Sequence, residues 1–133
     1  MYYMVHVYLS KSINLRKDAK YCLTIEDDGY FWYLYPYFEK IVEEPGQWID
    51  LYETAVFFQD KLDSLSKALN EARDSISDKP NEWSVKVGEQ IDPEKNELFS
   101  LVSKVKIIEL IDELLKITKE AKEQNLYLLF YGV

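Results

Sequence analysis

The chain has 133 residues, of which 47% are hydrophobic and 30% charged, and its formal net charge is −8. This size and composition predict one folded domain, residues 1–133, because disordered chains lack aromatic and branched aliphatic residues. The negative charge repels phosphate groups, which argues against DNA, RNA and anionic membranes as partners.

Cysteine, histidine and glycine are too few or too scattered for the common cofactor sites. The single cysteine, Cys22, cannot form an internal disulfide, and with the single histidine, His6, it cannot form a Cys/His zinc site. The four glycines are isolated, so no phosphate-binding loop is expected. We therefore expect no metal and no cofactor. The N-terminus lacks the pattern of a signal peptide, and no run of about 20 apolar residues occurs, which predicts a cytoplasmic protein.

The chain begins with a predicted β-hairpin. Apolar and polar residues alternate over residues 3–9 and again over 21–26, which is the period of a strand. The polar stretch between them would form the connection.

The next segment is the aromatic stretch YFWYLYPYF, residues 30–38. Its apolar residues would share one face of a helix, but Pro36 disfavours a helix interior and suits a first turn. We therefore expect an extended segment over 30–34, followed by a short helix from Tyr35 or Pro36 that ends at Pro45.

A strand and a helix follow. Residues 47–58 are rich in β-branched and aromatic side chains without helical spacing, which predicts a strand central to the sheet. Asp60 is a candidate N-cap for a helix over residues 60–76, whose leucines recur at steps of three and four.

The last part of the chain predicts a second hairpin, a long helix and a strand. Strict alternation over 83–88 and the turn that follows predict a hairpin with 97–102. Ser103 can cap the last helix, and Asn125 can adopt the left-handed conformation at its end. Residues 126–131 are too uniformly apolar for an exposed edge strand.

From residue 47 onward the order is strand, helix, strand, strand, helix, strand. This order predicts a ferredoxin-like βαββαβ core over 47–131, within an α+β fold that has a mixed sheet and two amphipathic helices on one face. The first 46 residues, with their hairpin and short helix, would either extend this sheet or cover its second face.

Two groups of residues could carry chemistry. His6 and Cys22 would lie about 5 Å apart if the first two strands pair, as a nucleophile and its base do, but no motif supports this and a structural histidine is favoured. Asp50 and Glu53 fall in a strand expected to be central, where an acid is costly unless it is paired, so they are secondary site candidates. No catalytic residue is predicted.

The aromatic excess is the strongest functional signal. Eleven tyrosines, three tryptophans and six phenylalanines are more than one small core accommodates, and tyrosine and tryptophan are enriched at protein interfaces. The alternative is that these rings line the core of the N-terminal part with their hydroxyls at the surface. The predicted partner-binding residues are Tyr30, Trp32, Tyr33, Tyr37, Glu39, Glu43 and Glu44.

The stretches DGYFWYLYPYFEKI, WIDLYETAVF and NEWSVKVGEQ belong to a small, acidic, tyrosine-rich chain without catalytic motifs. In these properties the chain resembles the immunity proteins with which bacteria neutralise their own polymorphic or contact-dependent toxins. The resemblance implies tight binding to a basic toxin domain, with acids steering the association.

The sequence thus favours a non-catalytic protein that binds a basic protein partner. The alternative is a small-molecule-binding or regulatory ferredoxin-like module, and such modules often form homodimers. An enzyme with paired carboxylates is the least favoured interpretation, since no motif places two of them together.

Overall fold

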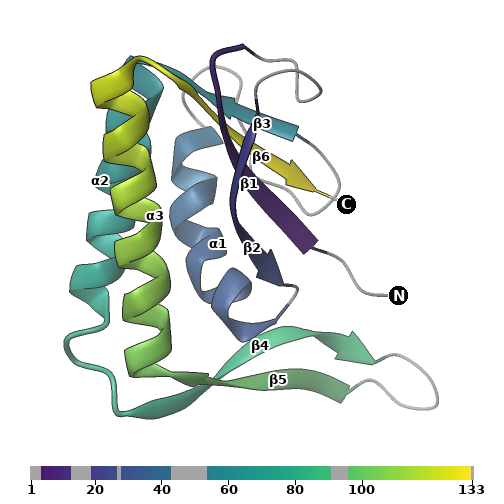
Figure 1. Ribbon diagram of the computed structural model, residues 1–133. Helices are drawn as coiled ribbons and strands as arrows, with labels where there is room; N and C mark the ends of the chain where they lie inside the picture. The colour runs from purple at the N-terminus through teal and green to yellow at the C-terminus, as the bar shows by residue number, and fades with distance from the viewer. Residues whose placement is uncertain (1–3, 13–18, 27, 43–53, 91–95, 133) are drawn as a thin grey trace.

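The computed structural model describes residues 4–12, 19–26, 28–42, 54–90 and 96–132. Over these residues the fold is α+β, with three helices and six strands in two antiparallel sheets. Figure 1 shows the helices on one side of the larger sheet and a separate hairpin beneath them. No helix in the described part is long and apolar enough to cross a membrane.

The larger sheet has four strands in the order β2 (Lys20–Glu26), β1 (Met4–Ser10), β6 (Tyr127–Gly132), β3 (Thr54–Phe57). Each neighbouring pair is antiparallel, so the described pairings do not make the mixed sheet that we expected. The N-terminal hairpin is confirmed and extends the sheet. The final strand lies inside the sheet, as its apolar sequence predicts.

Helix α1 (Gly29–Val42) runs through the aromatic stretch without a break. The prediction of an extended segment over residues 30–34 is therefore wrong. Pro36 lies in the interior of the helix and is exposed, while the apolar residues at steps of three and four face the core. Burial of that apolar face outweighs the unfavourable effect of a proline inside a helix, so the segment is helical throughout.

Helices α2 (Asp60–Ser75) and α3 (Lys104–Gln124) match the predicted helices. Asp60 does not cap α2, because it lies inside the first turn and the residue before it has no capping side-chain bond. Ser103 does cap α3 by accepting a hydrogen bond from the Lys106 N–H, and Asn125 has the predicted left-handed conformation with φ 56°.

Strands β4 (Glu82–Gln90) and β5 (Asn96–Ser103) form the predicted hairpin, but as a sheet of their own. The element order expected for residues 47–131 is confirmed; the single ferredoxin-like sheet is not formed. A ferredoxin-like sheet needs parallel pairing between β3 and β5, and here β3 is the last strand in its sheet rather than a central one. The inner face of the hairpin packs instead against α1, which lies between the two sheets.

One hydrophobic cluster joins these parts. It combines the core face of the larger sheet with the apolar faces of all three helices and with Val102 of the hairpin. The Phe130 ring in β6 lies 5.5 Å from the Phe57 ring in β3 and 6.3 Å from the Phe38 ring in α1, centroid to centroid. Fully buried residues of this cluster include Phe31, Leu34, Phe38, Phe57, Leu65, Ile107, Leu114 and Phe130.

Candidate partner-binding surface

The continuous helix α1 distributes its aromatic residues over different faces. The face toward the core carries Phe31, Leu34, Phe38 and Ile41, all of which are buried. A second face, toward α2 and the hairpin, carries three of the tyrosines predicted to bind a partner. The third face points outward.

Two tyrosines on the second face form hydrogen bonds with neighbouring elements. The Tyr30 hydroxyl accepts a hydrogen bond from the backbone N–H of Ser103 at 3.1 Å, where β5 meets α3. The Tyr33 hydroxyl lies 2.6 Å from the Ser75 hydroxyl. Because Ser75 uses its proton to bond the Ala72 carbonyl at 2.6 Å, Tyr33 is the donor of this pair.

Aromatic and cation–π contacts also hold Tyr33 and Tyr37 in place. The Tyr33 ring meets the Trp83 ring of β4 edge to face at 5.4 Å, and the Lys79 ammonium lies 5.9 Å from the Tyr33 ring. Burial raises the pKa of the Tyr33 phenol above its ordinary value. Tyr37 is half-buried and carries the Lys40 ammonium over its ring at 5.2 Å. Tyr30, Tyr33 and Tyr37 thus have packing roles.

The outward face of α1 carries Trp32, Tyr35, Pro36 and Glu39, which we call the α1 strip. Their spacing of three and four residues places them side by side on a helix. Trp32 and Tyr35 are partly buried with their rings 5.3 Å apart, while Pro36 and Glu39 are exposed. Of the predicted site residues that the structure describes, Trp32 and Glu39 come together here. Tyr35 was missed because the expected break at Pro36 separated it from Trp32.

The negative charge of the chain is concentrated in the segment of the sequence that contains α1. Residues 26–53 contain eight acidic residues and one lysine, whereas the whole chain has 24 acidic and 16 basic residues. Glu26 at the end of β2 and Glu39 in α1 are exposed. The remaining predicted acids, Glu43, Glu44, Asp50 and Glu53, lie outside the described residues.

A second surface was not predicted from the sequence. Six large apolar or aromatic side chains are exposed in the described part, and four of them lie within residues 98–105. Phe99 and Leu101 on β5 have 56% and 60% of their surface exposed. The available signal was the run ELFSLVS, which is apolar at positions of both parities, so that one face of the strand cannot bury all of them. We call Leu98, Phe99, Leu101 and Val105 the hairpin surface.

His6 and Cys22 do not form a catalytic pair. The strands pair as expected, but His6 lies opposite Thr24 and its Nδ1 is 2.7 Å from the Thr24 hydroxyl. The Cys22 thiol donates to the Lys20 carbonyl at 3.5 Å. Partial burial raises the pKa of this thiol, which lowers its reactivity as a nucleophile. His6 has the structural role that the sequence favoured.

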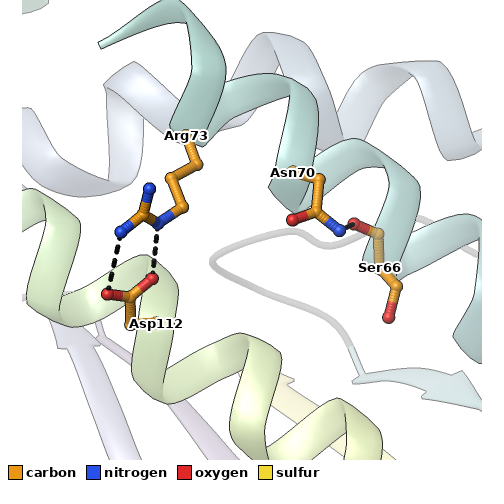
Figure 2. Close-up of polar contacts among 4 residues, drawn as sticks. All are labelled: Ser66, Asn70, Arg73 and Asp112. Atoms are coloured by element: carbon orange, nitrogen blue, oxygen red, sulfur yellow. Dashed lines mark hydrogen bonds and ion pairs between the residues drawn. The ribbon is translucent and has the colours of Figure 1, made fainter. Parts of the chain in front are cut away.

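A groove of about 470 Å³ lies between α2 and α3. Arg73 of α2 also joins the two helices, with two N–H···O contacts to Asp112 of α3 at 2.7 and 3.4 Å (Figure 2). In the groove lining, the Lys122 ammonium lies 2.9 Å from the Asp63 carboxylate, and the Asn70 amide donates to the Ser66 carbonyl of its own helix. Both ion pairs are solvent-exposed and therefore contribute little to stability, and we interpret the groove as part of helix packing.

Among the residues in the described ranges, no group of three or more His, Cys, Asp or Glu side chains could hold a metal ion. No protein-family model, curated protein or solved structure matches the chain. The functional argument therefore depends on the chemistry of the two surfaces.

Proposed function

We propose that this protein is a non-catalytic binding protein whose partner is a basic protein, in the manner of an immunity protein that neutralises a toxin. The observation that carries the proposal is the α1 strip, where the partly buried rings of Trp32 and Tyr35 stand beside exposed Glu39 in the most acidic part of the sequence.

The two residue types have separate roles in the proposed interface. Partly buried aromatic rings supported from below by a packed helix are rigid anchors, because little side-chain freedom is left to lose on binding. Surrounding carboxylates attract a basic partner over a distance and speed its association. Steering by charge weakens with ionic strength, so the association rate is the quantity to measure.

The test uses the product of the gene adjacent to that of this protein as the binding partner, with kinetics recorded at low and high salt. Glu39→Lys is expected to slow association by about 3- to 10-fold at low salt. Glu109→Lys is the matched control, because it makes the same charge change at an exposed position of α3. Trp32→Ala is expected to accelerate dissociation by at least about tenfold, as loss of an aromatic anchor does.

Trp32 also packs against the core, so the melting temperature of each variant is measured beside its kinetics. Partner binding that is unaffected by both Glu39→Lys and Trp32→Ala would contradict the proposed site. Failure of the neighbouring product to bind, or turnover of a substrate by this protein in the absence of its partner, would contradict the proposed function.

A further inference from the structure

Strand β5 has a backbone edge that pairs with no strand in the described part of the chain. At the base of the hairpin, the Lys104 N–H donates to the Asn81 carbonyl across the ladder at 2.8 Å. Because alternate residues of an antiparallel strand point their backbone groups to opposite sides, residues 97, 99 and 101 direct theirs away from β4. Ser103 points the same way, and its N–H is bonded to the Tyr30 hydroxyl. With respect to the described residues, the open edge therefore spans 97–101.

This edge lacks the usual protection against pairing. Soluble proteins cover or charge their edge strands, commonly with lysine, proline or a bulge. Strand β5, NELFSLVS, contains one charged residue, Glu97, and that carboxylate is 3.3 Å from the Lys86 ammonium of β4. Phe99 and Leu101 are exposed on the same face of the strand. Figure 1 shows the outer half of β5 on the side of the hairpin away from α1.

The backbone edge of β5 can pair with that of a second copy about Phe99. When two copies of β5 run antiparallel around a two-fold axis at Phe99, residue 97 of one lies opposite 101 of the other, and Phe99 faces Phe99. All three residues with free backbone groups then pair, and Ser103 keeps its bond to Tyr30. The two glutamates do not face each other, and each Leu101 lies diagonal to the opposite phenylalanine, within reach of its ring.

We propose that the chain forms a two-fold dimer in which β5 of one copy pairs antiparallel with β5 of a second copy, centred on Phe99. The pairing joins two hairpins into one four-stranded sheet, which suits a two-stranded sheet that is only marginally stable by itself. It also shields Phe99 and Leu101 from water. The α1 strip is not used, so this inference does not depend on the proposed function.

The first test is sedimentation equilibrium of the full chain, at concentrations from about 1 μM to 1 mM. The mass of the wild type is expected to rise from 15.8 kDa toward twice that value. Phe99→Lys places a lysine opposite a lysine, and Leu101→Glu places a glutamate opposite Glu97 of the other copy, so both variants are expected to stay monomeric. Their melting temperatures should equal that of the wild type at about 1 μM, where the wild type is itself monomeric. Tyr21→Lys is the matched control, because Tyr21 is an exposed aromatic on the terminal strand of the other sheet, and it should dimerise as the wild type does.

A second test fixes the register. In a Cys22→Ser background, Phe99→Cys should form a covalent dimer on mild oxidation, because the Cα atoms of a hydrogen-bonded antiparallel pair lie about 5.5 Å apart, within the range that a disulfide spans. Val105→Cys, which is exposed but outside β5, should not. A monomeric wild type at every concentration, dimerisation of both charged variants, or equal cross-linking through residue 105 would each overturn the proposal.

Discussion

Gly29 illustrates how closely α1 approaches the hairpin. A Cβ atom at this position would lie 2.6 Å from the Val102 side chain and 3.2 Å from the Ser100 carbonyl oxygen. Val102 is fully buried, so it has no open space into which to move. The missing side chain therefore lets the first turn of the helix rest on β5.

We expect Gly29→Ala to lower the free energy of unfolding by about 1–3 kcal/mol, the usual cost of overpacking a core. This would occur although alanine is otherwise the better residue in a helix. Gly88→Ala is the control, because a Cβ at Gly88 meets nothing within 4 Å. Urea unfolding of both variants checks the expectation. A more stable Gly29→Ala would show that helix and hairpin can separate at this point.

At the residue scale, the helix places Trp32 and Glu39 together on its outward face, and their role in binding stays a prediction. Tyr30 and Tyr33 make packing contacts that tyrosine composition could not reveal, because composition does not distinguish a hydroxyl that faces solvent from one that bonds Ser75 or the Ser103 backbone. Their partners are 42 and 73 residues away along the chain, and the sequence gives no local sign of them.

At the scale of elements, α1 is a continuous helix although Pro36 disfavours one. A proline in a helix interior costs about 3 kcal/mol, since it removes one hydrogen bond and crowds the preceding turn. Burial of one large apolar side chain contributes about 1.5–3 kcal/mol, and this helix buries Phe31, Leu34, Phe38 and Ile41. Burial of these four side chains together outweighs the cost of the proline, so the continuous helix is favoured.

Pro36→Ala is therefore expected to stabilise the protein by about 1–2 kcal/mol. The gain is smaller than 3 kcal/mol because proline also restricts the unfolded chain. Pro36 is exposed, so little packing is lost. Pro80→Ala, at an exposed position after α2, serves as the control and should be neutral or slightly destabilising. Chemical denaturation measures both, and a destabilised Pro36→Ala would mean that the ring itself stabilises the helix.

Elements were easier to predict than their pairing. The periodicity of apolar residues and the helix-capping residues predicted both hairpins, the two long helices and the final strand, because these signals are local in the sequence. The choice of partner for β6 is not local: it pairs with β1, more than 100 residues earlier, as well as with β3. The same element order is compatible with a ferredoxin-like sheet, but the structure places β3 at the end of its sheet and packs the separate hairpin against α1.

At the scale of the whole molecule, α1 is the connection between the two sheets. One side of the helix places Phe38 against Phe130 in the larger sheet, and another places Tyr33 against Trp83 in the hairpin. Since the buried residues form one cluster, a substitution that loosens the packing of one sheet should also destabilise the other.

Phe130→Ala is expected to lower the free energy of unfolding by about 3–5 kcal/mol, because Phe130 is 1% exposed at the centre of the core. In a Trp32→Phe, Trp48→Phe background, fluorescence reports on Trp83 alone. Its unfolding midpoint should shift by the same amount as the midpoint from far-UV circular dichroism, as two-state unfolding requires. Tyr131→Ala, at the exposed neighbouring position, should shift both far less. If Phe130→Ala moved the dichroism midpoint and left that of Trp83 in place, the hairpin would be an independent unit, and α1 would not couple the two sheets.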